Sequence, residues 1–263
     1  MHCGLLAAVT IAAAIAAFAH SGSAQELPLQ GFRPPPAPPI KPYQAVPVTP
    51  PAPLNDASFL AFRKELADVA AHKDRAALGK MVVVQKFFWI QDKDLADPHK
   101  SGIDNLAKAI DLGAADDSGW QVLGGFATEP SAAESPQQPG VFCAPADPNL
   151  DQNAFEALIK STRSDPSEWG YPTKAGLEVH AAAQPSSPVV EKLGLTLVRV
   201  VPDTSPPSDN PNEPFLLHIA TPSGKSGYVD AQSISPLGGD QICYTKQGGG
   251  WKIAGYLGGA AQQ

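Results

Sequence analysis

The sequence predicts an α+β protein, with a mostly helical N-terminal part followed by a β-rich C-terminal part. Apolar residues recur every three or four positions from Phe59 to Ala70, which is the period of an amphipathic helix. In the last third of the chain, short runs of β-branched and aromatic residues alternate with glycine and proline, which is typical of strands joined by turns. We therefore expect helices first and strands afterwards.

The mainly helical domain is expected over residues 56–170. Asp56 begins the first helix, and Asp74 has the position of an N-cap for a second helix through Leu78. The run Met81–Ile90 is ambiguous, because a buried strand and a continued helix both fit its apolar pattern. Residues 128–140 are expected to form a surface loop. Three further helices are expected at 103–110, 120–126 and 152–161.

The β-rich part is expected to consist of two segments, residues 171–237 and 238–263. Expected strands in the first segment are Gly176–Val179, Val189–Leu193, Leu195–Val201, Phe215–Ala220 and Gly227–Val229. Residues 238–263 are expected to form a closing β-hairpin and a tail. Two strands at 242–246 and 251–257 flank the three glycines Gly248–Gly250, which indicates a hairpin with a loose turn.

The N-terminus has the features of a signal peptide over residues 1–24. An apolar run is followed by Gly22, Ser23 and Ala24, so cleavage is expected before Gln25. His2 is the only basic side chain before the run, and an uncleaved signal anchor therefore stays open as an alternative. Cleavage would leave a periplasmic or secreted protein with no membrane span.

Residues 25–55 are expected to form a proline-rich linker. Ten prolines lie between Pro34 and Pro53, which disfavours helix and ladder hydrogen bonding and favours extended polyproline II.

Two cysteines, Cys143 and Cys243, stay in the chain after signal cleavage. An even pair in an oxidising compartment predicts one disulfide, which would join the helical part to the closing hairpin. Two buried free thiols are the alternative.

The charge excludes one class of partner. A net charge of −7 lacks the basic surface that phosphate backbones require, so we expect no nucleic-acid binding.

The segment from Gly176 to His180 and the proline–serine loop after it resemble the opening of bacterial SH3-like domains. Gly224–Val229, GKSGYV, is similar to a second element of that family, and Phe215 stands where the family usually has Trp or Tyr. The chain departs from the pattern at Glu178 and His180, where Asn and Arg are commoner. The resemblance covers residues 171–237 and implies a small SH3-like β-barrel. Its members bind peptidoglycan or other proteins.

No catalytic or metal motif is evident in the sequence, and we expect no cofactor, no metal site and no enzyme activity. The acidic stretch from Asp92 to His99 is not an EF-hand loop, because Asp97 replaces the glycine at position six and Ile103 the glutamate at position twelve. Cys143 with a histidine could in principle form a cell-wall hydrolase. A disulfide would remove that nucleophile.

The ligand-binding candidates are therefore Tyr228, Phe215, His180 and Lys225. Tyr228, beside the Gly224–Gly227 turn, is the aromatic candidate to face a ligand, with a place in the core as the alternative, whereas Phe215 and Trp251 are expected to lie mainly in the core. These residues predict a non-catalytic exported protein that recognises peptidoglycan or a periplasmic protein. The alternative is an accessory or inhibitory subunit of an envelope complex, with the acidic loop 202–214 steering a basic partner.

Overall fold

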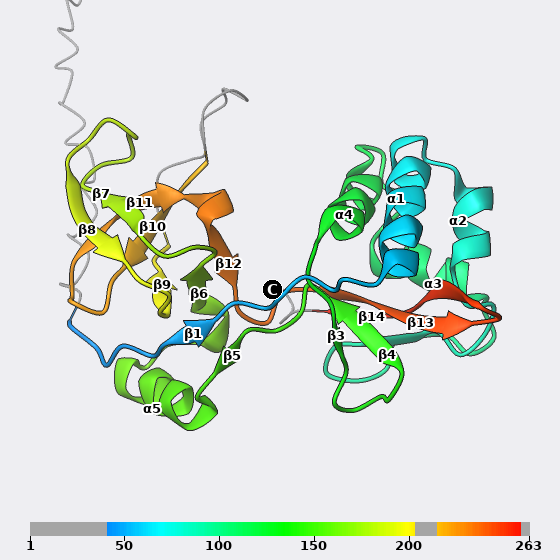
Figure 1. Ribbon diagram of the computed structural model, residues 1–263, viewed down its shortest axis with the longest axis horizontal. Helices are drawn as coiled ribbons and strands as arrows, with labels where there is room; N and C mark the ends of the chain where they lie inside the picture. The colour runs from blue at the N-terminus through cyan, green and yellow to red at the C-terminus, as the bar shows by residue number, and fades with distance from the viewer. Residues whose placement is uncertain (1–40, 203–214, 259–263) are drawn as a thin grey trace, which may run out of the picture. The chain divides into compact units, whose positions relative to one another are not determined.

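The computed structural model describes residues 41–202 and 215–258 (Figure 1). The expected signal peptide, residues 25–40 of the expected linker and most of the acidic loop lie outside the described residues.

The helices are α1 Ala57–Ala71, α2 Arg75–Met81, α3 Gly102–Ala109, α4 Ser118–Thr128 and α5 Gln152–Thr162, with short 3₁₀ turns η1 Pro166–Glu168 and η2 Ala231–Ser233. The strands are β1 Val48–Thr49, β2 Phe88–Ile90, β3 Ala133–Glu134, β4 Val141–Ala144, β5 Asn149–Leu150, β6 Trp169–Pro172, β7 Leu177–His180, β8 Val189–Leu193, β9 Val198–Val200, β10 Leu216–Ala220, β11 Ser226–Asp230, β12 Ile234–Pro236, β13 Gln241–Gln247 and β14 Gly250–Leu257.

The α+β class is confirmed: the described strands form sheets of two, five and seven strands. Among the described residues, no helix has the length and apolar character needed to cross a membrane.

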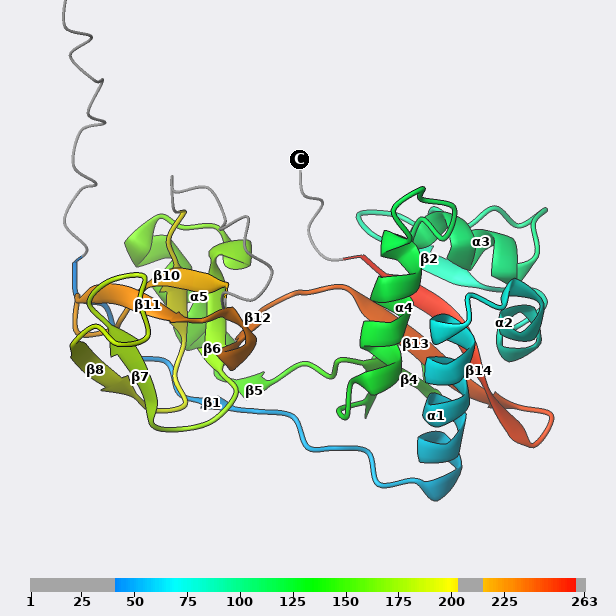
Figure 2. The same cartoon turned by 90° about the horizontal axis from the view of Figure 1, so that it is seen from above.

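The first region is a five-stranded sheet covered by helices α1–α4. Its strand order is β2-β14-β13-β4-β3, so the C-terminal hairpin β13–β14 lies in the middle of the sheet. Figures 1 and 2 both show α1 and α4 side by side next to this hairpin. The part expected to be mainly helical thus contains strands, because its apolar segments 88–90 and 141–144 pair with the C-terminal hairpin β13–β14. Sequence periodicity gives no signal for such distant pairing.

The helix starts follow the expected capping chemistry. The Asp56 carboxylate accepts hydrogen bonds from the backbone N–H groups of Ser58 and Phe59, at 2.8 and 3.0 Å. The Asp74 carboxylate accepts one from the N–H of Ala77 at 2.9 Å. The ambiguous run Met81–Ile90 ends α2 at its first residue and forms strand β2 at its last three. The expected loop 128–140 includes the short edge strand β3.

One large core holds the first region together. The α1 stripe of Phe59, Phe62 and Leu66 is buried against the sheet, and the Phe59 ring packs edge-on against Tyr244 with centroids 5.0 Å apart. Trp251 is 5 % exposed, so its expected core position is confirmed.

Cys143 and Cys243 form the expected disulfide. They are directly opposite each other in the antiparallel pair β4–β13. The bond therefore joins the helical part to the hairpin, as expected, within a single sheet.

The second region is a seven-stranded sheet in the order β12-β6-β9-β10-β11-β7-β8. Its inward side chains form one cluster that includes Ile234 of β12 and Leu193 of β8, from opposite ends of that order. The three residues of η2 connect β11 to β12, which stand four places apart in that order. A flat sheet would hold those two strands about 19 Å apart at nearly 5 Å per strand, farther than so short a connection reaches, so the sheet must curl. It does not close, because no ladder joins β12 to β8 among the described residues. The small SH3-like barrel expected over residues 171–237 is therefore not confirmed: these residues form an open, curled sheet.

Residues 41–50 pack against the second region, so this part of the expected linker is folded. The Tyr43 hydroxyl hydrogen-bonds to the carbonyl oxygens of Ala220 and Leu197, at 2.9 and 3.2 Å, and its ring meets Trp169 edge-on. Val46 is fully buried, and its carbonyl accepts from the N–H of Leu197.

Candidate functional site

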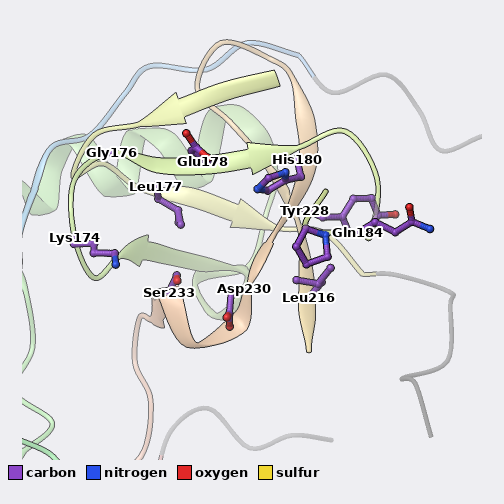
Figure 3. Close-up of a pocket in the computed structure, with 11 residues that line it drawn as sticks. Lys174, Gly176, Leu177, Glu178, His180, Gln184, Leu216, Tyr228, Asp230 and Ser233 are labelled. Atoms are coloured by element: carbon purple, nitrogen blue, oxygen red, sulfur yellow. The ribbon is translucent and has the colours of Figure 1, made fainter. Parts of the chain in front are cut away.

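A cavity of about 290 Å³ opens on the second region (Figure 3). It is near the lower end of the size range for small-molecule pockets. Strand β7 forms one wall, and the end of β11 with η2 forms another. The lining residues are Lys174, Gly176, Leu177, Glu178, His180, Gln184, Pro185, Leu216, Tyr228, Asp230 and Ser233.

Three ring side chains form a row across three neighbouring strands beside the cavity. Tyr228 of β11 pairs in register with His180 of β7 on one flank and with His218 of β10 on the other. The His218 ring stacks on Tyr228, with centroids 4.8 Å apart and planes 15° from parallel. Each of the three has a sequence neighbour buried in the core: Val179, Val229 and Ile219. Because side chains alternate along a strand, the three rings point outward.

His180 is held in one orientation by the loop that follows β7. Its Nδ1 lies 2.9 Å from the carbonyl oxygen of Ser187. A carbonyl oxygen only accepts, so Nδ1 carries the hydrogen and donates. In the neutral ring, Nε2 is then an acceptor, which gives the cavity wall a group that can receive a hydrogen bond from a ligand.

The charged groups of the cavity are two carboxylates and one ammonium. Glu178 forms an exposed ion pair with Lys192 at 2.8 Å, and the Lys192 hydrogen bond, followed by its charge, lowers the pKa of Glu178. One Asp230 oxygen accepts from the N–H of Gln232 and begins η2. Lys174, between β6 and β7, supplies the ammonium.

The structure brings two of the four ligand candidates to this cavity, Tyr228 and His180. Phe215 and Lys225 do not line it. The Lys225 ammonium donates to the carbonyl of Val190 at 3.0 Å. The core position expected for Phe215 is wrong: its side chain is 59 % exposed, because it stands just before β10, where the sheet no longer covers it.

Leu216, Asp230 and Ser233 also line the cavity, and no sequence motif pointed to them. Strand alternation could have found part of the set, since Tyr228 and Asp230 are two residues apart and share a face. Ser233 carried no such signal, because it lies in a 3₁₀ turn.

The acidic stretch at 92–99 has structural roles. The Asp94 carboxylate accepts from the N–H groups of Trp89 and Ala96, and Asp97 accepts from the N–H of His99. Within residues 41–202 and 215–258, no three His, Cys, Asp or Glu side chains gather as a metal site would require.

Comparison with known proteins gives no relative: no family model, no curated protein and no solved structure matches this chain.

Proposed function

We propose that this chain is an exported, non-catalytic binding protein that recognises a cell-envelope component through an SH3-like module. The observation that carries the proposal is the cavity bordered by Tyr228 and His180, with Leu177 and Leu216 as apolar lining. Aromatic and apolar surface with a few polar groups at its edge is the usual composition of a ligand site.

The compartment is supported by the disulfide between Cys143 and Cys243. Disulfides persist in oxidising compartments such as the periplasm. The signal-like segment 1–24 agrees with export. The disulfide also occupies Cys143, the only cysteine considered as a nucleophile, so a binding role is favoured over hydrolysis.

The test is co-sedimentation of the purified protein with peptidoglycan sacculi at low and high salt. We expect pelleting that resists salt, because apolar and stacking contacts are screened little by ions. Tyr228→Ala should reduce the pelleted fraction about tenfold, and His180→Gln should reduce it less. Phe215→Ala is the matched control, since it removes an exposed aromatic ring outside the cavity.

Each variant is first checked for an unchanged thermal unfolding midpoint, so that lost binding is separated from lost folding. Equal pelleting of Tyr228→Ala and wild type would contradict the site. Absence of pelleting by the wild type would contradict wall binding and favour the accessory-subunit alternative.

A further inference from the structure

The ring of Tyr228 presents one face to the cavity. His218 covers the other face, since the two rings stack with centroids 4.8 Å apart and planes 15° from parallel. That separation matches the spacing of neighbouring strands, so the Tyr228 ring stands upright on the sheet, with one face toward β10 and the other toward β7. The cavity lies on the β7 flank, because His180 lines it and His218 does not. A ligand in the cavity therefore meets the face of Tyr228 that His218 leaves open.

The space beside this ring exists because β7 and β11 diverge. Their register consists of the single pair His180–Tyr228, although β11 continues to Asp230. Figure 3 shows His180 and Tyr228 close together, and Gly176 and Asp230 farther apart. The resulting volume of about 290 Å³ has room for one six-membered sugar ring with its substituents, and not for several.

The polar groups that line the cavity include both donors and acceptors. The ammonium of Lys174 donates, the carboxylate of Asp230 accepts, and Nε2 of the neutral His180 ring accepts. The Ser233 hydroxyl and the Gln184 amide can do both. Hydroxyl groups also donate and accept, so a ligand that carries several of them can pair with every member of this mixed set.

The charges of the cavity cancel. Glu178 is neutralised by its ion pair with Lys192. Asp230 and Lys174 then remain, one carboxylate against one ammonium. A ligand with a net charge would gain from one of them what it loses to the other, and it would also lose part of its hydration. An uncharged polar ligand is therefore favoured.

Apolar surface lies beside these polar groups. Leu177, Leu216 and Pro185 line the cavity together with the Tyr228 ring. A sugar ring has the same two kinds of surface, since its C–H groups form an apolar face and its hydroxyl groups surround that face. Packing of the apolar face on an aromatic ring, with hydrogen bonds at the rim, uses both kinds of surface in the cavity.

We infer that the cavity binds one uncharged sugar residue of a glycan strand, with the C–H face of the sugar on Tyr228 and its hydroxyl groups on the polar lining around Asp230. This inference rests on the proposed binding function and names the glycan, rather than the peptide, as the part of the cell wall that is recognised. Every disaccharide repeat of cell-wall glycan contains one uncharged N-acetylated sugar, so the wall supplies this ligand.

The test follows backbone amide signals of the ¹⁵N-labelled full chain by NMR during titration with oligosaccharides. The main probe is the tetramer of N-acetylglucosamine, which is uncharged. The tetramer of glucosamine, which is cationic, and the tetramer of galacturonate, which is anionic, are the charged probes. Stem peptides released from sacculi are the remaining probe.

The uncharged tetramer is expected to shift the amides of Leu177, Tyr228 and Ser233, and both charged tetramers should bind more weakly. Tyr228→Ala should weaken binding of the uncharged tetramer about tenfold, because it removes the ring face. Tyr228→Phe keeps that face and should retain most of the affinity. Phe215→Ala removes an exposed ring outside the cavity and should leave the affinity unchanged.

Two further substitutions test the charge balance in opposite directions. Asp230→Asn leaves the ammonium of Lys174 unopposed, so it should bind the galacturonate tetramer about threefold more tightly than wild type does. Lys174→Met leaves the carboxylate of Asp230 unopposed, so it should bind the glucosamine tetramer more tightly than wild type does. Both side chains are exposed, so both variants should keep the wild-type thermal unfolding midpoint.

The inference is overturned if the uncharged tetramer shifts no cavity amide at millimolar concentration, or if Tyr228→Ala binds it as tightly as wild type does. Tighter binding of a charged tetramer or of the stem peptides by the wild type would also overturn it. Sacculus pelleting with stem-peptide binding alone would overturn this inference and leave the wall-binding proposal standing. Tetramer binding without sacculus pelleting would instead remove the wall as the source and leave the sugar site standing.

Discussion

The two regions of this molecule build their interiors differently. In the helix-covered five-stranded sheet, 25 buried apolar residues form a single cluster, and a disulfide crosses the sheet. In the seven-stranded region, the core consists of two separate clusters of six buried residues each, and residues 41–50 contribute to one of them. The sheet of this second region stays open among the described residues, and it carries the candidate site.

We relate this difference to stability in the first region and to ligand binding in the second. A large contiguous core favours stability, since each fully buried side chain contributes about 1.5–3 kcal/mol. A ligand site needs apolar surface and a few polar groups that can bind the ligand. The second region provides apolar lining and placed polar groups at the cavity bordered by Tyr228 and His180.

The largest expected effect comes from the disulfide. Cys243→Ser should lower the free energy of unfolding by about 4–5 kcal/mol in the chain-entropy model, because the bond closes a loop with a sequence separation of 100 residues. Urea denaturation under oxidising conditions measures it. The variant should match wild type treated with reductant. A loss below about 1 kcal/mol would show that the first region does not depend on the bond.

The next effect tests the large core. Phe59→Ala should lower the free energy of unfolding, measured by urea denaturation, by about 3–5 kcal/mol, because the fully buried ring packs against both Tyr244 and Trp251. Leu60→Ala, one residue along the same helix at a side chain 48 % exposed, is the matched control and should cost much less. Similar losses from the two substitutions would contradict the packing of α1.

The two regions also differ in how much one buried tyrosine hydroxyl contributes to stability. The Tyr43 hydroxyl is hydrogen-bonded in the second region, so Tyr43→Phe should cost about 1 kcal/mol. The Tyr244 hydroxyl is buried in the first region without a hydrogen-bond partner among the described residues. Tyr244→Phe should therefore be neutral or slightly stabilising. Thermal unfolding of the two variants checks the contrast, and equal losses would refute it.

The smallest effect depends on pH at the start of α1. Hydrogen bonds from Ser58, then from Lys246 and the Phe59 N–H, hold the pKa of Asp56 below its ordinary value of 3.8. A lowered folded pKa means that the carboxylate stabilises the fold above its unfolded pKa, and that this contribution is lost as the pH falls through the folded value.

The wild type should thus be more stable than Asp56→Asn near neutral pH, and the difference should shrink as the pH falls below about 4. Unfolding midpoints of both proteins across the acid range measure this. Lys246→Met is the control, since it should reduce the pH dependence without abolishing it. A constant difference down to about pH 2 would contradict the assignment.

Local signals predicted local structure well. Asp56 and Asp74 mark helix starts because a capping carboxylate bonds to N–H groups two or three residues away. Strand β8 has the expected bounds, since its residues lie between clear turn signals. Strands β4 and β6 were not predicted, because each depends on partners far along the chain.

The same limit applies to the candidate site. The motif around Gly176–His180 and Tyr228 lies on strands that border the cavity, and the structure brings Tyr228 and His180 together there. It could not assign Asp230 or Ser233, since their position depends on where β11 separates from β7.

By itself, the sequence determined the α+β class, the helix starts at Asp56 and Asp74 and the pairing of Cys143 with Cys243. These follow from period, capping and composition, which act over a few residues or require only a count. Tertiary structure alone decided that the C-terminal hairpin lies at the centre of the first sheet and that the second sheet curls without closing. Both depend on pairing between strands far apart in the sequence, as between Phe88 and Gly255, for which a single sequence carries no local signal.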